Sequence, residues 1–439
     1  MILGSDVMKV FISGGGIAGL TLALKLLQNN VNVTVAEKNA KPSPKYKGEL
    51  LQPKSIEILS HLGLGDQLLK YGEKIEQMIV KEIEPTHQVK YAKWDYRILD
   101  HSYNYAMMIP HEKLKEILLD ACHQLNDHFY FGNTKFITLE PEGTGLKRVA
   151  VIEQAGQEKR IPSDFFVGAE GRMSPVRQTL GIGLKRKKYN HHFLTVSFPK
   201  PSQLKEATII TKGDQLLGVF PLPNDLVRTV LLIKSGEYKQ LLRSGLDTLH
   251  QRYIDLMPEM DGFVQSIDSF KKIQLMIPVN HHAETYVSEN AVIIGDAAHS
   301  VHPIAGEGMN LAMQDSDVLG ELLAWMNRTN QLDPTLLRWF ERVRRPRVEY
   351  ISNLSHLSAL VYSYDFALWR KFRMQVLQRI EKNTRLHFKQ ILNISGLGAW
   401  EENMLDRFIQ AGFPLAQHLG QSINQKEHFY TKKDDYPWY

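Results

Sequence analysis

Three glycines stand in the spacing G-x-G-x-x-G, at Gly14, Gly16 and Gly19. In a strand–turn–helix unit, the first glycine allows a tight turn, the second lets a pyrophosphate approach the backbone, and the third lets helix and strand pack closely. The pyrophosphate would lie at the helix N-terminus, where free N–H groups and the helix dipole favour an anion. Glu37, followed by Lys38, stands near the offset of about 20 residues expected for a ribose-binding carboxylate. The spacing predicts a nucleotide site and leaves open whether the nucleotide is NAD or FAD.

A second carboxylate follows another buried strand far along the chain. Residues 291–294 form an apolar run that leads directly into Gly295 and Asp296. A carboxylate at that point can accept hydrogen bonds from a polyol such as a ribityl chain. A further turn, Gly168 to Gly171, follows the apolar run 165–167. A single βαβ unit would suggest a nicotinamide dehydrogenase, but these downstream turns do not belong to that pattern.

Hydrophobic periodicity predicts the elements that position these residues. Lys9–Ser13 is expected as a buried strand, Ile17–Gln28 as a helix, and the alternating valines from Val31 to Val35 as the next strand. Helices are also expected at Lys54–Leu62, His111–Leu125 and Leu246–Met257, and mainly helical structure from Asn310 onward. A small meander is expected from the segments Phe129–Phe131, Lys135–Leu139 and Val149–Glu153, and a β-sheet platform from residues 77–105 and 193–234.

Composition places the chain among ordinary globular proteins, because 43% of its 439 residues are hydrophobic and 23% are charged. The net charge of +5 is too mild to imply a nucleic-acid partner. The single cysteine, Cys122, cannot form an intramolecular disulfide, which fits a cytoplasmic protein. Its place on an expected helix favours a small core hydrophobe over a catalytic thiol. The apolar helix near the N-terminus is shorter than the roughly 20 residues of a membrane span.

Other kinds of active site find little support. His299 and His302 are three positions apart, and residues 191–192 and 281–282 are histidine pairs, but no cysteine pair or H-E-x-x-H motif accompanies them. We therefore expect no metal site. The chain also has no G-x-S-x-G elbow, which argues against a hydrolase nucleophile. No side chain is assigned as a catalytic group.

The segment 291–319 reads AVIIGDAAHSVHPIAGEGMNLAMQDSDVL. Together with GGGIAGL at 14–20 and VGAEGRMSPVR at 167–177, it resembles the single-component FAD-dependent monooxygenases of the aromatic-hydroxylase family, over about residues 8 to 350. The resemblance implies that Asp296 binds the ribityl chain and that Pro303 to Asn310 line the isoalloxazine ring. The helix starting near Met309 would point its N-terminus at the flavin pyrimidine ring, where its dipole stabilises negative charge on reduced flavin. The hard chemistry would belong to the cofactor, so the protein need not supply a nucleophile.

Two positions depart from the family pattern. The family usually has Asp-Gly where this chain has Glu170-Gly171, which affects docking of reduced nicotinamide. The family often has Arg where His111 stands, three positions before Leu114, which weakens a cofactor phosphate contact that Lys113 or Lys47 would replace. Residues 48–53 resemble the squalene epoxidase and polyprenyl-phenol hydroxylase branches, whereas residues 303–308 also resemble the geranylgeranyl reductases.

The expected fold is α/β. A Rossmann-type FAD-binding domain would be assembled from residues 1–76, 106–180 and 286–345, with a β-sheet substrate domain from 77–105 and 181–285 and a C-terminal helical extension from 346–439. The flavin-lining residues would include Pro303, Gly306 and Gly308. The expected cofactor-binding residues are Gly14, Gly16, Ile17, Ala18, Gly19, Glu37, Lys38, Gly48, His111, Asp296, Pro303, Gly306, Glu307, Gly308, Met309 and Asn310.

The resemblance implies an NAD(P)H- and O2-dependent flavoprotein that hydroxylates or epoxidises a hydrophobic aromatic or polyprenyl small molecule through a flavin hydroperoxide. FAD would be the cofactor and NAD(P)H a transient co-substrate. The alternatives are a prenyl-type reductase, an NAD-dependent dehydrogenase and a flavin-binding protein without turnover. The choice between NADH and NADPH, the substrate and the oligomeric state stay open.

Residues 369–392 hold seven Lys or Arg and one Glu, interleaved with aromatic and aliphatic side chains. One interpretation is a helix that packs on the body and presents a solvated basic face. The other is weak attachment to an anionic membrane surface, which would suit a lipophilic substrate.

Overall fold

The computed structural model of the chain describes residues 7–39, 48–84, 86, 88–142, 148–363, 366–413 and 423–439. Its centre is a six-stranded sheet in the order β20-β21-β12-β1-β2-β8, in which only β20 is antiparallel to its neighbour. These strands are β1 Lys9–Ser13, β2 Asn32–Ala36, β8 Tyr130–Phe131, β12 Phe165–Gly168, β20 Val287–Ser288 and β21 Ala291–Ile293. The middle strands β1, β12 and β21 are almost wholly buried, as expected of parallel strands that are covered on both faces.

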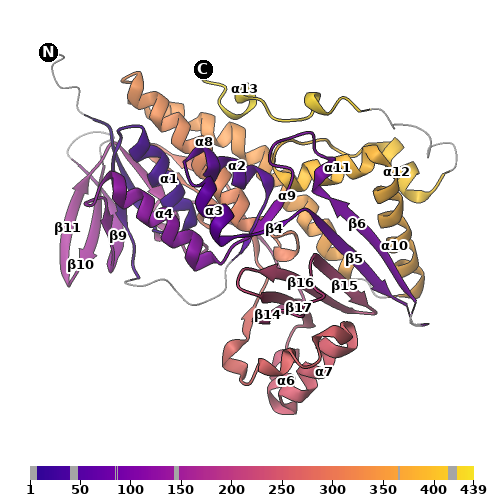
Figure 1. Ribbon diagram of the computed structural model, residues 1–439. Coiled ribbons are helices and arrows are strands. Elements are labelled where there is room, and N and C mark those ends of the chain that lie inside the picture. Colours follow the sequence, from indigo (N-terminus) through magenta and orange to yellow (C-terminus); the bar gives the residue numbers. More distant parts are fainter. Residues whose placement is uncertain are drawn as a thin grey trace.

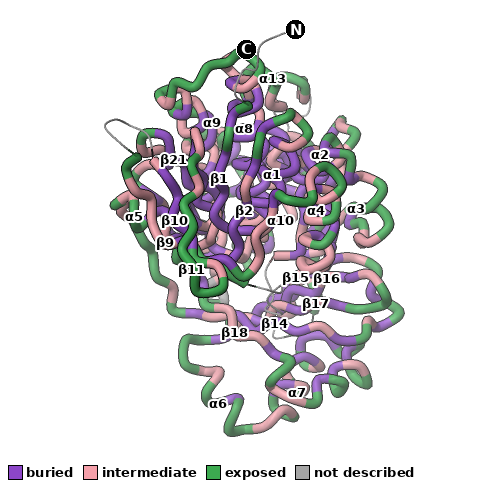
Figure 2. Tube along the Cα trace, turned by 90° about the vertical axis from the view of Figure 1, so that its left-hand side faces the viewer, coloured by how far each residue is buried: buried purple, intermediate pink, exposed green. Residues whose placement is uncertain are grey.

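Helices cover this sheet (Figure 1). They are α1 Ile17–Gln28, α2 Pro53–His61, α3 Gly65–Tyr71, α4 His111–Leu125 and α8 Gly308–Arg328, with the short α5 Pro175–Thr179 beyond β12. Helix α1 packs against both α4 and α8, and Figure 2 shows this centre as the most buried part of the molecule. Cys122 of α4 is fully buried, and burial raises the pKa of its thiol to about 12, which confirms a core residue. The predicted strand–turn–helix–strand unit and the α/β class are confirmed.

One predicted strand belongs elsewhere. The meander is formed by β9 Thr134–Pro141, β10 Arg148–Gln154 and β11 Gln157–Pro162, so placing Phe129–Phe131 in it was wrong. Tyr130 and Phe131 instead extend the central sheet by pairing with β2 in parallel. Phe129 is fully buried in the central core, and its carbonyl accepts a hydrogen bond from the Val35 N–H, so burial and pairing both fix the segment there.

A seven-stranded sheet forms the lower part of Figure 1, in the order β18-β14-β17-β16-β15-β5-β6. Its strands are β5 Gln77–Ile83, β6 Val89–Asp95, β14 His191–Pro199, β15 Ala207–Lys212, β16 Gln215–Leu222, β17 Leu226–Lys234 and β18 Gln274–Met276. One face, including Leu194 and Val196 of β14, packs on helices α6 Glu237–Ser244 and α7 Leu246–Leu256. Because strand side chains alternate, the intervening residues of β14 face the central part of the molecule.

Two small sheets connect the large ones. One contains β3 Leu50–Leu51, β4 Glu73–Ile75 and β7 Ala106–Met108, and the other contains β13 Leu184–Lys187, β19 Asn280–Ala283 and β22 His299–Ser300. Arg228 of β17 donates two hydrogen bonds to the Glu49 carboxylate, at 2.8 and 2.9 Å. This bidentate pair fixes the segment before β3 against the seven-stranded sheet.

The C-terminal part is mainly helical: α9 Arg338–Ser363, α10 Ala367–Lys382, α11 Thr384–Ser395, α12 Met404–Ala411 and the short α13 Lys432–Asp435. Residues 423–439 run back over the central part, and α13 lies above α2 and α8 in Figure 1. Asp435 pairs with Lys54 at 3.0 Å and with Arg347 at 2.5 Å, and the Tyr436 hydroxyl donates to Asp317 at 2.7 Å. These contacts tie the end of the chain to α2, α8 and α9.

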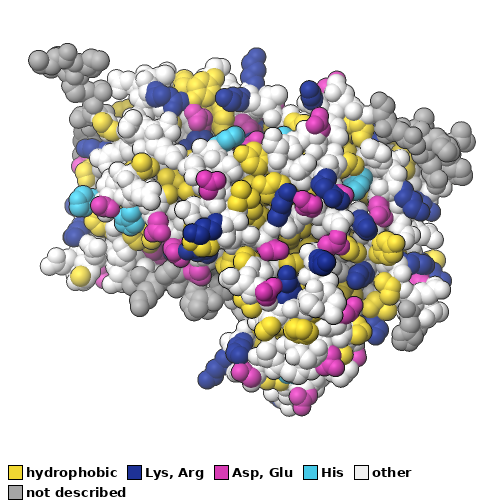
Figure 3. Space-filling model, viewed as in Figure 1, with side chains coloured by type: hydrophobic (Ala, Val, Ile, Leu, Met, Phe, Trp, Pro, Cys, Tyr) yellow, Lys and Arg dark blue, Asp and Glu magenta, His cyan; other side chains and the backbone are white. Residues whose placement is uncertain are grey.

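The basic stretch 369–392 is not one solvated helix. It is divided at Asn383, whose side chain caps α11, and several of its cations form intramolecular contacts. Arg373 pairs with Glu82, both side chains being buried, and Lys389 pairs with the buried Asp406 at 2.6 Å. Figure 3 shows acidic and basic side chains intermixed over the visible face. In the described part of the chain, every helix is too short or too polar to cross a bilayer.

Candidate active site

The glycine turn between β1 and α1 has the geometry that its spacing predicts. Gly14 has φ +107°, and a Cβ there would come within 2.5 Å of the Ala169 carbonyl oxygen. A Cβ on Gly19 would overlap the Gly14 carbonyl oxygen, so the third glycine is needed for close packing. Gly16 is the N-cap of α1, has no side-chain cap, and a Cβ there would meet nothing within 4 Å. The first turn of α1, with Ile17 and Ala18, is therefore open to an approaching anion.

Glu37 stands at the carboxyl end of β2, beside the glycine turn. Its Oε2 accepts a hydrogen bond from the Gly15 N–H at 2.8 Å, and its Oε1 accepts from the Asn39 N–H at 2.9 Å. The carboxylate is buried, whereas Lys38 is exposed. Glu37 therefore shapes the turn, and it lies on the side of the turn where the adenosine ribose of a dinucleotide would be placed.

Gly295 and Asp296 follow β21 and lie between α1 and α8. Gly295 has φ +58°, and a Cβ there would lie 3.0 Å from the Ala312 Cβ and 3.5 Å from the Ala18 Cβ. The Ser316 hydroxyl of α8 donates to the Ala18 carbonyl at 2.8 Å. The first and third sequence motifs therefore meet directly, although almost 300 residues separate them in the sequence.

A buried network behind this turn was not predicted from the sequence. Asp315 of α8 is fully buried and accepts hydrogen bonds from the Gly295 N–H at 2.9 Å, from His299 Nε2 at 2.6 Å and from Arg344 Nε at 2.8 Å. Burial alone would raise the pKa of the Asp315 carboxyl, but the charges and hydrogen bonds of His299 and Arg344 outweigh it and lower the pKa to about 2. Asp315 is thus an anion that holds the Gly295–Asp296 turn in place.

The loop from Pro303 to Gly306 leads into α8. Gly306 has φ +68°, and a Cβ there would lie 3.1 Å from Leu50 Cδ2. Asn310 connects this loop to β3, because its Oδ1 accepts from the Gln52 N–H at 2.8 Å. Its Nδ2 donates to the carbonyls of Leu50 and Gly306 at 3.0 and 2.9 Å. Segments 48–53 and 303–310, about 250 positions apart in the sequence, thus form one unit.

The N-terminus of α8 is available to a ligand. Glu307 occupies the N-cap position without a side-chain cap, and a Cβ on Gly308 would meet nothing within 4 Å. Burial raises the pKa of Glu307 well above its ordinary value, although a hydrogen bond with Gln52 opposes the shift. The Tyr96 hydroxyl donates to Gln52 Oε1 at 2.9 Å. Gln52 and Tyr96 were not among the predicted site residues.

Gly48, His111 and Met309 also come together. His111 Nδ1 lies 3.3 Å from the Gly48 carbonyl oxygen, and a Cβ on Gly48 would lie 3.4 Å from the Met309 Cβ. Lys113, suggested as a substitute phosphate ligand, pairs with Glu116 at 2.7 Å. Lys47, the other suggestion, lies outside the described residues. Glu170 follows β12, accepts from the Ser174 hydroxyl at 2.6 Å, and has its pKa raised by burial.

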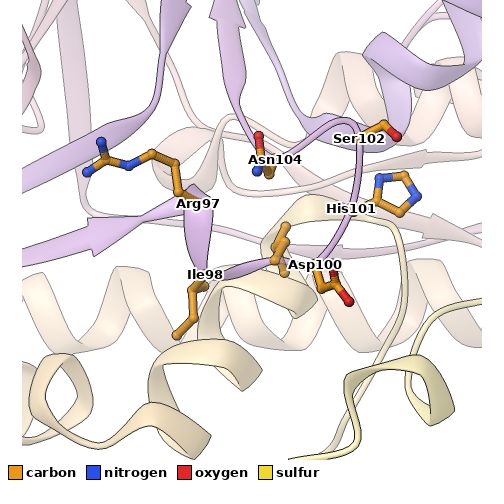
Figure 4. Close-up of a pocket in the computed structure, with 7 residues that line it drawn as sticks. Arg97, Ile98, Asp100, His101, Ser102 and Asn104 are labelled. Carbon is orange, nitrogen blue, oxygen red and sulfur yellow. The ribbon is translucent and has the colours of Figure 1, made fainter.

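The described residues include no group of three or more His, Cys, Asp or Glu arranged to hold a metal ion. An open cleft of about 670 Å³ lies along the loop Arg97–Asn104 (Figure 4). The Asp100 N–H of that loop donates to Gln425 of the C-terminal segment at 2.8 Å. None of the predicted cofactor residues lines this cleft, so it is separate from the candidate site.

The geometry fits a flavin dinucleotide. Two uncapped helix N-termini, at Gly16 and Gly308, each have open space beside a glycine. Asp296 follows β21, two strands from β1 in the parallel sheet, so it lies at the same carboxyl edge as the glycine turn. A crevice outside the carboxyl ends of parallel strands is where such folds bind dinucleotides.

Comparisons with known proteins agree with this geometry. A family model described as FAD binding domain matches residues 7–355. The chain therefore belongs to this family of FAD-dependent monooxygenases, in which FAD is the cofactor and NAD(P)H the co-substrate.

Two relatives and one solved structure illustrate the likeness. The chain is 29% identical to 6-methylpretetramide 4-monooxygenase of Streptomyces rimosus, over 77% of this chain and 81% of the relative. It is 25% identical to ubiquinone hydroxylase UbiL of Rhodospirillum rubrum, over 89% and 91%. The structure of Pseudomonas aeruginosa PqsL in complex with 2-aminobenzoylacetate matches with a TM-score of 0.72 and 21% identity, over 82% of this chain and 97% of that chain. At 21% identity, the similarity to PqsL shows a shared fold.

We expect Asp296→Ala to weaken FAD binding. Loss of a hydrogen bond to a charged group costs about 1.5–3 kcal/mol, which corresponds to roughly a ten- to hundredfold loss of affinity. Glu37→Ala should act in the same direction at the adenosine end. Fluorescence titration of apoprotein with FAD measures both, with Asp268→Ala as a control in the exposed Lys272 pair. Unchanged affinity in both site variants would contradict the placement of the cofactor.

We expect the folded protein to lose stability as the pH falls below about 6.5. Burial lowers the pKa of His281 and of His282 to about 4. The unfolded chain then binds protons that the folded chain does not, which costs up to about 1.4 kcal/mol per pH unit for each histidine. Urea unfolding at about pH 7.5 and about pH 5.5 measures the effect, and His281→Gln should reduce the slope. Equal stability at both pH values would refute this expectation.

Proposed function

We propose that the protein is an NAD(P)H- and O2-dependent monooxygenase that hydroxylates or epoxidises a hydrophobic aromatic or polyprenyl small molecule in the cytoplasm. The observation that carries the proposal is the convergence of the glycine turn, the Gly295–Asp296 turn and the loop Pro303–Gly306 at the N-termini of α1 and α8. The curated relatives support the reaction class, because one is named a 6-methylpretetramide 4-monooxygenase and another a ubiquinone hydroxylase.

Each segment has a distinct task in this proposal. Residues Gly14 to Gly19 bind the pyrophosphate, Glu37 binds the adenosine ribose, and Asp296 accepts hydrogen bonds from the ribityl chain. Pro303 to Asn310 line the flavin ring, and the N-terminus of α8 stabilises negative charge on the ring system. When bound and reduced, FAD supplies the activation of O2 and the transfer of one oxygen atom to the substrate.

An apolar environment beside this loop supports a hydrophobic substrate. Phe220 and Leu222 of β16 belong to the same hydrophobic cluster as Leu50 of β3. A Cβ added at Gly306 would lie only 3.1 Å from Leu50, so this cluster borders the loop. Phe388 of α11 belongs to that cluster too, so the seven-stranded sheet and the C-terminal helices both contribute. Removal of water from such surroundings favours binding of apolar ring systems and strengthens electrostatic interactions inside the site.

Aerobic NAD(P)H oxidation with a panel of hydrophobic phenols, quinolones and polyprenyl compounds tests the proposal, with product masses measured. A gain of one oxygen atom is expected. A gain of two hydrogen atoms would instead identify the prenyl-type reductase. Tight NAD binding by colourless protein would indicate a dehydrogenase, and FAD binding without turnover of any compound would indicate a flavin-binding protein.

We also propose weak association with an anionic membrane surface, carried by the corner where α10 begins. Phe366, Leu368 and Phe372 are 55%, 76% and 41% exposed there, next to the exposed Lys371. Aromatic and leucine side chains can enter the headgroup region while a nearby Lys contributes about 1 kcal/mol. Arg373 and Arg379 are unsuitable for testing this by charge reversal, because Arg373 pairs with Glu82 and Arg379 donates to the Gln410 carbonyl.

Flotation with vesicles containing anionic lipid, at low and high salt, tests the association. Unmodified protein should float at low salt and less at high salt. The double variant Leu368→Gln, Phe372→Gln should not float, whereas Leu69→Gln, at a 62% exposed position on α3, should float normally. No flotation of unmodified protein at low salt would end the membrane proposal and leave the monooxygenase proposal intact.

A further inference from the structure

Two buried histidines meet directly beside the loop that lines the proposed flavin site. His302 immediately precedes Pro303 and is fully buried, and His191, at the start of β14, is 8% exposed. Their Nε2 atoms lie 2.8 Å apart. His302 belongs to the central part of the molecule and His191 to the seven-stranded sheet, so this contact joins the two parts next to the site.

The hydrogen-bond partners determine where the protons lie. The Ile304 N–H donates to His302 Nδ1 at 3.3 Å, so Nδ1 must carry a lone pair. Neutral His302 therefore carries its proton on Nε2 and donates it to His191 Nε2, which places the proton of neutral His191 on Nδ1. Both hydrogen bonds exist only while both rings are neutral.

We propose that His191 and His302 form a neutral imidazole clamp that holds the loop Pro303–Gly306 in its flavin-lining shape, and that proton uptake opens the clamp. A proton added to His191 Nε2 would face the Nε2–H of His302 at 2.8 Å. The contact could be restored only by moving the His302 proton to Nδ1, which breaks the hydrogen bond from Ile304. One proton from solvent therefore breaks one of the two hydrogen bonds in either arrangement. Both histidines are positioning residues, and the inference rests on the proposed place of the flavin.

The surroundings favour the neutral pair. Burial and the neighbouring His191 and His356 lower the pKa of His302 to about 3, and burial with His192 lowers the pKa of His191. Tyr189 packs edge-on against His302, with ring centres 4.4 Å apart, and its hydroxyl lies 3.0 Å from His356 Nδ1. Burial and, to a smaller extent, the charge of Lys187 lower the pKa of His356. None of these neighbours carries a negative charge that would stabilise a protonated imidazole.

The first test uses apoprotein and does not depend on FAD. Two-bond ¹⁵N–¹H spectra of histidine-labelled protein report the tautomer and protonation of each ring. At about pH 7 we expect neutral His302 with its proton on Nε2 and neutral His191 with its proton on Nδ1. Titration of His302 near the ordinary value of about 6.5, or a proton on its Nδ1, would overturn the clamp.

The second test compares FAD affinity at about pH 7.5 and about pH 5 by fluorescence titration. In this range the proton is expected to enter at His191, whose pKa is lowered less than that of His302. His302→Asn retains an acceptor for the Ile304 N–H and cannot take up a proton. Because it lacks the Nε2 contact with His191, it should bind FAD several-fold more weakly than the unmodified protein already at neutral pH, as expected for one hydrogen bond. It should lose little further affinity on acidification, where the unmodified protein should lose several-fold. His302→Gln cannot replace the acceptor at Ile304 and should bind more weakly than His302→Asn at neutral pH.

The control is His128→Gln, at an exposed histidine between α4 and β8, away from the pair. It should follow the unmodified protein at both pH values. Equal pH dependence in His302→Asn and the unmodified protein would refute the clamp. Failure of every variant to bind FAD at any pH would refute the proposed cofactor site, while the spectra of apoprotein would still decide on the clamp.

Discussion

Asp315→Ala is expected to destabilise the protein by about 3–5 kcal/mol, the usual cost of removing one partner from a buried ion pair. Arg344 and His299 would remain buried without their carboxylate, and the Gly295 N–H would lose its acceptor. The loss should appear as a lower denaturant midpoint in urea unfolding. Since the same carboxylate holds the turn that presents Asp296, FAD affinity should fall in the folded fraction as well.

The matched control is Asp268→Ala, which removes an aspartate from an exposed pair with Lys272 at 2.9 Å. Exposed pairs contribute about 0–1 kcal/mol, so its midpoint should hardly move. The loss of stability in Asp315→Asn should lie between those of Asp315→Ala and Asp268→Ala. The amide oxygen can still accept a hydrogen bond from the Gly295 N–H, but the charge of Arg344 stays uncompensated. A loss of less than about 1 kcal/mol of unfolding free energy in Asp315→Ala would show that this network does not hold the Gly295–Asp296 turn in place.

Gly306→Val is expected to reduce turnover by roughly a hundredfold, the order of effect of misplacing a reacting group by about 1 Å. The position has φ +68°, where a β-branched residue is strained, and its Cβ would lie 3.1 Å from Leu50. Either the loop Pro303–Gly306 or β3 must therefore shift. Because Asn310 is hydrogen-bonded to both, a shift of one disturbs the other. NAD(P)H oxidation coupled to product formation measures the loss once a substrate is known, and the flavin absorption spectrum reports the altered surroundings of the ring before then.

A glycine of the same backbone conformation serves as the control. Gly262 has φ +81°, lies after α7 and has nothing within 4 Å of an added Cβ. Gly262→Val should lose a similar stability through backbone strain and keep full turnover. If both variants lost activity in proportion to stability, simple unfolding would explain Gly306→Val and the special role of the loop would be abandoned.

The amino-acid sequence was sufficient to predict those elements whose pattern lies within one short segment of the chain. The glycine turn, the strand before Asp296 and the helix His111–Leu125 depend on short-range spacing and hydrophobic periodicity, and the structure has them at the predicted positions. The placement of Gly14, Gly19 and Gly295 in tight turns follows from the same local reasoning.

The parts that could not be predicted depend on partners distant in sequence. Asp315 shares one face of α8 with Leu311 and Leu319, four positions to either side, which signals a buried ion pair. That pattern does not identify Arg344, 29 positions away, as its partner. Tyr130 and Phe131 are close in sequence to the meander, but they pair with β2 at the edge of the central sheet. The local sequence pattern does not indicate this pairing. The charges of residues 369–392 suggested a solvated face because Glu82, the partner of Arg373, lies 291 positions away.

The strand order of the central sheet also has a consequence for biosynthesis. β1 is made early, but its neighbour β12 and the next strand β21 end only at Gly168 and Ile293. At about 5–20 residues per second, translation from β1 to β21 takes on the order of 15 to 55 s. The edge of β1 lacks its partner until β12 has been made, and the apolar face of α1 lacks its partner on α8 throughout that time. We therefore expect the nascent chain to depend on chaperones until α8 has emerged. The yield of folded protein should rise when chaperones are co-expressed with it.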